Sequence, residues 1–197
     1  MAATEMKPLR VMLVDENPER ARVLEEVLVC AGYTVAVKIT GRADLAAQVS
    51  RVKPDVILID MDSPDRDTLE AMHTLAREQP TPVVMFVDQS DSESIQRAVR
   101  AGVSGYIVGG VSAERVKPIM EVAIARFREF QSLKDELERT KSTLAARKTI
   151  EKAKGILMKR RGMSEDDAYQ ALRKMAMDRN QRLEEVAINV ISISEFL

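Results

Sequence analysis

The chain has 197 residues, of which 45% are hydrophobic and 31% are charged, and its formal net charge is −1. A chain of this length holds one large domain or two small ones, and its apolar content excludes wholesale disorder. One cysteine, one histidine, no tryptophan and 4% aromatic residues exclude an internal disulfide, a zinc site of the usual kind and an aromatic platform for single-stranded bases.

The first 112 residues alternate between strand and helix signals. Apolar runs predict strands over 9–14, 34–39, 55–59, 82–87 and 106–108, and the segments between them predict helices over 19–31, 44–52, 67–78 and 92–101. Continuous apolar strands separated by helices predict an α/β fold with a five-stranded, doubly wound parallel sheet. The β-branched run at 34–39 is typical of an edge strand. The first helix is expected to bury Val23, Val27 and Leu28.

A fifth helix opens near Ser112 and shows no stop signal before Gly155. Its apolar side chains follow an imperfect heptad pattern, with Phe130, Leu133, Leu137 and Leu144 on a or d positions. Such a helix packs either on its own chain or on a second copy. We favour a dimerising coiled coil, because so small a chain offers no other partner for so long a helix.

The last 55 residues predict three helices. The first runs to Arg161 and stops at Gly162, Ser164 caps the second, and a turn at 178–180 leads to the third. The residues expected to face the core are Ala168, Leu172, Met175, Leu183, Val186, Ala187 and Ile191. The predicted organisation is therefore an α/β domain over 8–112, a long helix or coiled coil over 113–142 and a three-helix module over 143–197.

Three carboxylates follow two neighbouring strands of the predicted sheet. Asp15 and Glu16 come after the first strand and Asp60 after the third, and ligands of such sheets gather at the carboxyl ends of the strands. Clustered carboxylates repel one another and suit Mg²⁺, next to which a carboxylate can accept a phosphoryl group. Taken singly, each acid could instead be a solvated helix cap.

Residues 9–112 resemble a response-regulator receiver domain. The resemblance rests on Leu13-Val14-Asp15-Glu16, on Leu58-Ile59-Asp60 with Pro64 four residues later, and on Ala101-Gly102-Val103-Ser104-Gly105-Tyr106. It implies that Asp60 is the phosphoacceptor equivalent and that the acidic pair holds Mg²⁺.

Two positions depart from the receiver pattern. Receivers place Thr or Ser after the fourth strand and Lys after the fifth, where this chain has Val87 and Gly109. The switch hydroxyl and the ammonium that pairs with phosphoryl oxygens are both missing. We therefore expect a pseudo-receiver that serves as a binding platform, with residual phosphorylation at Asp60 as the alternative.

The charge of the chain is unevenly spread. Residues 1–112 carry 12 basic and 17 acidic residues, a net charge of −5, whereas residues 113–197 carry 18 and 14, a net charge of +4. Residues 139–161 alone hold nine basic residues and one acid, Glu151. An acidic half and a basic segment indicate two modules with different partners.

Helical geometry sorts this basic segment into two faces. Ala146, Ile150, Ala153 and Leu157 share one sector, which predicts a core face. Opposite to them lie Lys141, Lys148, Lys152 and Lys159, which we call the lysine face. A row of ammonium groups almost without acids indicates a phosphate backbone as the partner. A merely solvated lysine face remains the alternative.

The same segment resembles the core of the ANTAR domain, the RNA-binding module of AmiR/NasR-type transcription antiterminators. The resemblance rests on Arg147-x-x-Ile150-x-x-Ala153-Lys154-Gly155-Ile156-Leu157-Met158 and on Gly162-Met163-Ser164, Ala168-Tyr169 and Leu172-Arg173 downstream. It implies contact with an RNA hairpin, and it makes Ala153 and Gly155 positions of close approach, with helix packing as the alternative role of both. The expected RNA contacts are Lys148, Lys152, Lys154, Lys159, Arg160, Arg161 and Arg173.

The order of receiver, coiled coil and ANTAR domain resembles NasT-type nitrate-assimilation antiterminators over the whole chain. The resemblance implies a non-enzymatic regulator that stabilises a leader-RNA hairpin, needs no cofactor and is sequestered by a nitrate-sensing partner. No signal peptide or membrane span is visible, so we expect a cytoplasmic protein without a membrane partner. The alternatives are a phosphorylation-controlled DNA-binding response regulator and an adaptor that contacts only proteins.

Overall fold

The computed structural model describes residues 8–40, 45–109, 111 and 113–195. The chain divides into two compact units, Met1–Phe130 and Gln131–Leu197. One helix, α5 (Ala113–Arg161), contributes residues to both units.

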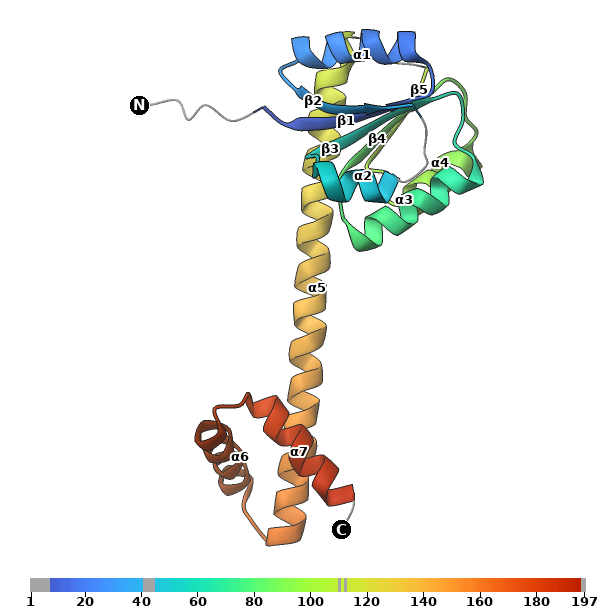
Figure 1. The fold of residues 1–197 in the computed structure, drawn as a ribbon. Coiled ribbons are helices and arrows are strands. Elements are labelled where there is room, and N and C mark those ends of the chain that lie inside the picture. Colours follow the sequence, from blue (N-terminus) through green and yellow to red (C-terminus); the bar gives the residue numbers. More distant parts are fainter. Residues whose placement is uncertain (1–7, 41–44, 110, 112, 196–197) are drawn as a thin grey trace. The chain divides into compact units, whose positions relative to one another are not determined.

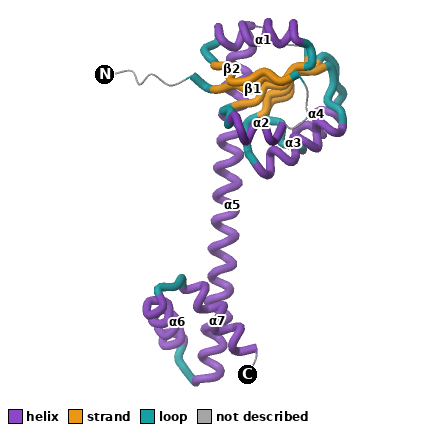
Figure 2. The backbone as a smooth tube through the Cα atoms, viewed as in Figure 1, coloured by secondary structure: helices purple, strands orange, loops and turns teal. Residues whose placement is uncertain are grey.

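The first unit is a five-stranded parallel sheet with helices on both faces (Figures 1 and 2). The strands are β1 (Arg10–Asp15), β2 (Thr34–Ile39), β3 (Val56–Met61), β4 (Val83–Val87) and β5 (Gly105–Val108), in the spatial order β2-β1-β3-β4-β5. The helices are α1 (Pro18–Cys30), α2 (Leu45–Val52), α3 (Arg66–Glu78), α4 (Ser92–Arg100) and the first turns of α5. The predicted doubly wound sheet is confirmed, with β2 at its edge.

The three central strands are buried on both faces, which explains their continuous apolar sequences. Along β1 and β3, Leu13 and Leu58 join the layer that α1 and α5 cover, whereas Met12 and Ile57 join the layer that α2, α3 and α4 cover. This alternation follows from the two-residue repeat of a strand. The sheet therefore separates two apolar layers, and its strand ends lie at the rim between them.

The start of α5 belongs to the core of the first unit. Val116, Met120, Ala123 and Ile124 are buried in the same layer as α1. The predicted boundary at residue 112 was therefore wrong, because the turns that complete this layer come after it. The segment 113–142 is not a linker throughout, since the sheet needs its first turns as a cover.

Helix α1 lies in a different rotational phase from the predicted one. It buries Ala21, Leu24 and Leu28, whereas Val23 is 52% exposed. Successive residues of an α-helix lie about 100° apart, so a core face centred on Leu24 turns Val23 outward. The expectation that Val23 is buried was wrong.

The second unit holds the end of α5 together with α6 (Glu165–Arg179) and α7 (Leu183–Glu195). Ser164 caps α6 through a hydrogen bond from the backbone N–H of Asp167, and Asn180 ends it in the left-handed conformation at φ 49°. The buried core of this unit is small. It consists of Ala153, Leu157, Ala168, Leu172, Ala176, Val186 and Ala187.

The middle of α5 exposes its heptad side chains. Phe130, Leu133, Leu137 and Leu144 each keep more than half of their surface in contact with solvent in the single chain. No helix in the described ranges is both long and apolar enough to cross a bilayer.

Candidate nucleic-acid interface and receiver cluster

Two of the three predicted carboxylates meet at the end of the sheet. Asp15 and Asp60 are register partners in adjacent strands β1 and β3, and they are 1% and 3% exposed. Glu16, the next residue after β1, is exposed. The alternation that places Asp15 inside the rim turns its neighbour outward.

The guanidinium of Arg20, in the first turn of α1, lies between these two carboxylates. Its Nε lies 3.1 Å from Oδ2 of Asp15 and 3.1 Å from Oδ2 of Asp60, and its Nη2 lies 3.1 Å from Oδ1 of Asp15. Its Nη1 lies 3.4 Å from Asp62 and 4.0 Å from Asp88. We call the four carboxylates with Arg20 the receiver cluster.

The charges of the receiver cluster are not balanced. Burial raises the pKa of Asp60 to about 6, and the negative charges of Asp15 and Asp88 add to this shift, although the charge of Arg20 opposes it. The hydrogen bond to Asp15 raises the pKa of Arg20, so its charge is permanent. Within the described ranges, no group of three acidic, histidine or cysteine side chains is arranged to hold a metal ion.

The two degenerate receiver positions lie at the ends of β4 and β5. Val87 is fully buried and is the register partner of Met61, so its apolar side chain belongs to the core. Gly109 has a φ of 95°, a conformation that L side chains rarely adopt, so a lysine would be strained there. The next hydroxyl after β4, that of Ser90, is hydrogen-bonded to the hydroxyl of Tyr106 at 2.8 Å.

The lysine face of α5 is exposed where it was predicted to be. Lys148, Lys152 and Lys159 are all exposed, while Ala153 and Leu157 on the opposite side are buried in the core. Lys141, in the same row, pairs with Glu138 at 3.0 Å.

Gly155 lies in the middle of this row. Seven residues after Lys148 and four before Lys159, it shares their sector of the helix. It is exposed, and a Cβ added to it would meet no atom within 4 Å. The fold therefore gives no reason for a glycine at a position where alanine would favour the helix. Ala153, the other predicted position of close approach, is instead fully buried.

Lys154 does not belong to the predicted contact surface. Its residue is 8% exposed, and its Nζ lies 2.8 Å from Glu151 and 2.7 Å from Glu165. These two hydrogen bonds raise the pKa of Lys154, and the bond to Lys154 lowers that of Glu165. The expectation that Lys154 contacts RNA is corrected, because its ammonium already joins α5 to the start of α6.

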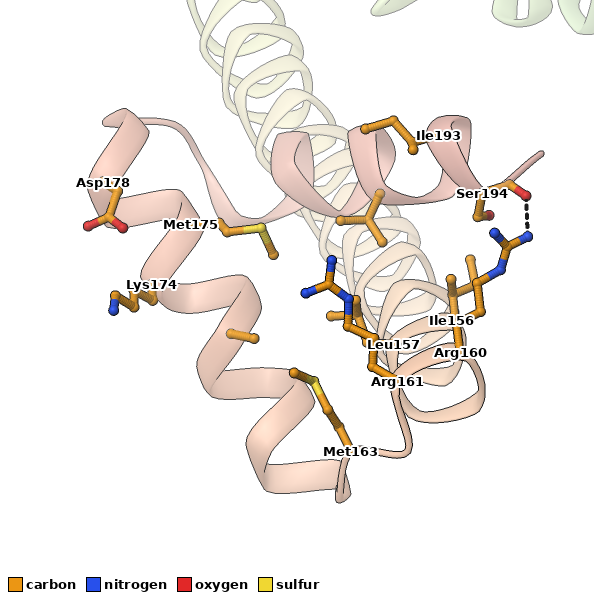
Figure 3. A pocket seen from close by; sticks show the side chains of 12 residues that line it. Ile156, Leu157, Arg160, Arg161, Met163, Lys174, Met175, Asp178, Ile193 and Ser194 are labelled. Carbon is orange, nitrogen blue, oxygen red and sulfur yellow. Dashed lines mark hydrogen bonds between the residues drawn. The ribbon is translucent and has the colours of Figure 1, made fainter. Parts of the chain in front are cut away.

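The arginines at the end of α5 border an apolar hollow of about 530 Å³ between α5, α6 and α7. Arg160 donates a hydrogen bond to the carbonyl oxygen of Ser194 at 2.6 Å, so it holds the end of α7 (Figure 3). Arg161 lies over the same hollow, together with Leu157 and Met163 (Figure 3).

Arg173 borders a second groove, also of about 530 Å³, where α6 ends and α7 begins. Tyr169, which is 40% exposed, lies one turn before it on α6. Asn180, Gln181 and Arg182 complete the polar lining, which contains no acidic residue. An aromatic face, two amides and two guanidinium groups are the side chains that recognise unpaired bases and their phosphates.

Both parts of the chain match known families. Residues 11–121 match the response regulator receiver domain, and residues 138–191 match the ANTAR domain. The chain is 32% identical over 181 residues to the transcriptional regulatory protein PdtaR of Mycobacterium tuberculosis, a match that covers 91% of this chain and 88% of that protein. The chain is an ANTAR-domain response regulator.

This ANTAR-domain response regulator is also similar to the nitrate regulatory protein of Klebsiella oxytoca, with 44% identity over 77 residues that cover 39% of the chain and 19% of that protein. Its receiver fold matches the signal receiver domain of a modulated diguanylate cyclase from Desulfovibrio desulfuricans, with a TM-score of 0.54 and 24% identity over 61% of this chain and 97% of that one. The signal receiver domain of the response regulator NarL from Mycobacterium tuberculosis matches with a TM-score of 0.53 and 20% identity. That match covers 60% of this chain and 98% of the NarL domain.

Sequence reasoning about the ANTAR-domain response regulator missed Arg20, Asp62 and Asp88 of the receiver cluster, and it missed Tyr169 as a site residue. The contact of Arg20 with Asp15 could have been predicted, because Arg20 follows Asp15 by five residues and lies in the first turn of the helix that begins next to the strand ends. Tyr169 was noted only as part of the ANTAR pattern, and the low aromatic content of the chain hid it. Its exposure beside Arg173 could not be read from helix periodicity alone.

Proposed function

We propose that this protein is an RNA-binding transcription antiterminator. The observation that carries the proposal is the lysine face of α5, whose exposed Lys148, Lys152 and Lys159 lie opposite the buried core of the ANTAR domain. An exposed row of ammonium groups binds a phosphate backbone by releasing its counterions. RNA is favoured over DNA because the basic helix belongs to an ANTAR domain.

The proposed mechanism needs no catalysis. By holding one hairpin of a leader transcript, the protein shifts the population of RNA folds away from a competing terminator, and the polymerase continues. The groove at Tyr169 and Arg173 supplies a second contact, suited to unpaired bases of the loop. The similarity to a nitrate regulatory protein supports nitrate or nitrite assimilation as the regulated process.

The exposed glycine of the lysine face supports the same interface. At Gly155 a phosphate backbone can approach the helix axis more closely than any side chain would allow. The helix loses about 1 kcal/mol relative to alanine at such a position. A ligand that needs the space explains the residue, whereas the packing of the chain does not.

The exposed heptad residues of α5 support a homodimer. Phe130, Leu133, Leu137 and Leu144 form an apolar row that the single chain leaves in solvent. A second copy of the same helix would cover this row as a short coiled coil. The dimer would place two ANTAR domains on one transcript.

The receiver is proposed to act as a pseudo-receiver in the cytoplasm. Val87 and Gly109 lack the hydroxyl and the ammonium that phosphorylation-dependent switching uses. Control would then come from a protein partner, such as a nitrate-sensing protein that sequesters the chain. Asp60→Asn should accordingly leave antitermination intact in cells, and a large loss of antitermination would favour control by phosphotransfer.

The deciding experiment is a gel shift of the full chain with leader-RNA hairpins over a series of salt concentrations. Replacing Lys148 and Lys152 with alanine should weaken binding and reduce the slope of log K against log salt by about 2. The matched control replaces Lys117 and Lys134, exposed lysines of the same helix outside the ANTAR domain.

Each alternative function predicts a different outcome of this experiment. Equal slopes of log K against log salt for the two double variants would contradict the proposed role of the lysine face in RNA binding. Efficient competition by duplex DNA would favour a DNA-binding regulator. Salt-insensitive or absent binding to every hairpin would favour an adaptor that contacts only proteins.

A further inference from the structure

The receiver cluster already contains a cation that belongs to the chain. Arg20 is anchored in the first turn of α1, where the side chain of Asn17 caps the helix by accepting hydrogen bonds from the N–H groups of Glu19 and Arg20. Its guanidinium contacts carboxylates from both strand ends, Asp15 at the end of β1 and Asp60 one residue before the end of β3. One side chain thus links two strands that pair side by side in the sheet.

The space between these carboxylates cannot hold Arg20 and a divalent cation together. Mg²⁺ binds carboxylate oxygens at about 2.0–2.1 Å in octahedral geometry, with water completing its shell. Here the Nε of Arg20 lies 3.1 Å from an oxygen of each buried aspartate, so a metal ion bridging them would enter the volume of the guanidinium. A second positive charge at this distance would also be repelled by the guanidinium itself.

We propose that Arg20 is a built-in counter-ion that replaces the divalent cation of the receiver fold. The guanidinium matches carboxylates by geometry as well as charge, because it donates several hydrogen bonds from one rigid plane. Its presence does not depend on the metal concentration, so the ends of β1 and β3 are held together whether or not Mg²⁺ is available. Asp60 Oδ2 has Arg20 as its partner, and the chain binds no Mg²⁺ at this rim.

The test uses Mn²⁺ and Mg²⁺ alone, as probes of the full-length chain. Paramagnetic Mn²⁺ should leave the amide resonances of Asp15, Asp60 and their neighbours unbroadened in the wild type, and millimolar Mg²⁺ should not shift its melting temperature. Arg20→Met removes the charge but keeps most of the side-chain volume. This variant should bind Mn²⁺ at least about 10-fold more tightly than the wild type, because a nearby like charge has been removed.

Two further variants keep the proposal falsifiable. Arg20→Lys retains a positive charge and should remain insensitive to metal, whereas Arg22→Met, two residues along α1, removes a solvent-exposed arginine that pairs with Glu26 and should behave as the wild type. If Arg20→Met folds only when Mg²⁺ is present, the metal is replacing the guanidinium and the proposal is supported. Broadening of the Asp15 and Asp60 resonances in the wild type, or a Mg²⁺ response equal to that of Arg20→Met, would overturn it.

Discussion

The Nζ of Lys154 lies 2.7 Å from Oε1 of Glu165, across the turn that joins α5 to α6. The same ammonium also bonds Glu151, one turn before it on α5. A lysine in the midst of a basic sequence segment thus has two acidic partners and little access to solvent. Lys148 and Lys159 of the same helix, by contrast, are exposed.

Lys154→Met should therefore lower the melting temperature of the ANTAR domain and leave the salt dependence of RNA binding unchanged. Its matched partner is Lys159→Met, which removes an exposed lysine from the lysine face of the same helix. That variant should melt like the wild type, and its binding should show a salt slope smaller by about 1. Thermal denaturation and anisotropy titrations measure the two effects; a reduced slope for Lys154→Met would restore it to the interface.

Gly155→Ala should raise the stability of the ANTAR domain and lower its affinity for RNA. Because a Cβ there meets no atom of the chain, alanine should raise the free energy of unfolding of the ANTAR domain by about 0.5–1 kcal/mol. RNA affinity should nevertheless fall, since the methyl group lies within the lysine face. Ser142→Ala, elsewhere on α5, serves as the control for helix propensity. Unchanged affinity in Gly155→Ala would show that no ligand approaches this point closely.

Tyr169→Leu should weaken hairpin binding about 10-fold, because a stacked base contributes roughly 1–3 kcal/mol. Tyr169→Phe keeps the ring and should bind as the wild type does. Quenching of 2-aminopurine placed at successive loop positions reports the stacking directly. Equal affinity for Tyr169→Leu, in a protein that still binds the hairpin, would remove the groove at α6 and α7 from the interface.

Leu137→Glu should turn the proposed dimer into a monomer, because a charge would be buried in the middle of the apolar row. Ser132→Glu adds the same charge to α5 outside the heptad positions and should leave the assembly unchanged. Sedimentation velocity at several protein concentrations distinguishes the two. A wild type that is monomeric at every concentration would contradict the coiled coil itself.

Asp60→Asn should change how stability depends on pH. The folded-state pKa of about 6 lies above the ordinary value of 3.8, so the folded chain binds this proton more tightly than the unfolded chain. The resulting stability is complete at low pH and is lost as the pH rises through about 6. Between about pH 4 and 7 the wild type should lose roughly 2 kcal/mol relative to Asp60→Asn. Urea unfolding at a series of pH values measures the difference; parallel curves would contradict it.

Much of the fold could be predicted because apolar periodicity decides it. The strand that contains Leu58 is apolar next to the sheet's two helical layers, since helices cover the sheet on both faces. In the second unit, the buried residues Ala153 and Leu157 repeat at helical spacing. The phase of α1 and the end of the first unit were less accessible. Both depend on which helix turns cover the sheet. The sequence around Val116 does not reveal whether this residue lies in a linker helix or, as the structure shows, in the core of the first unit.

The site residues divide along similar lines. Exposure of Lys148 and Lys159 follows from their position opposite the core, so periodicity finds it. The ion pairs of Lys154 and Arg20 do not follow from periodicity, because their partners come from other elements. Glu165 lies beyond a turn, and Asp60 lies on a strand 40 residues away from Arg20 in sequence. Long side chains that reach across elements are the part of a site that a one-dimensional pattern leaves out.

The resident guanidinium of Arg20 has a consequence for the timing of a signal. An acyl phosphate stores a signal in a covalent bond, and the signal persists until that bond is hydrolysed. If Arg20 takes the place of the cation, as we propose, the receiver would keep no such record of past stimuli. Its output would instead begin when the proposed sequestering partner dissociates and would end when that partner binds again.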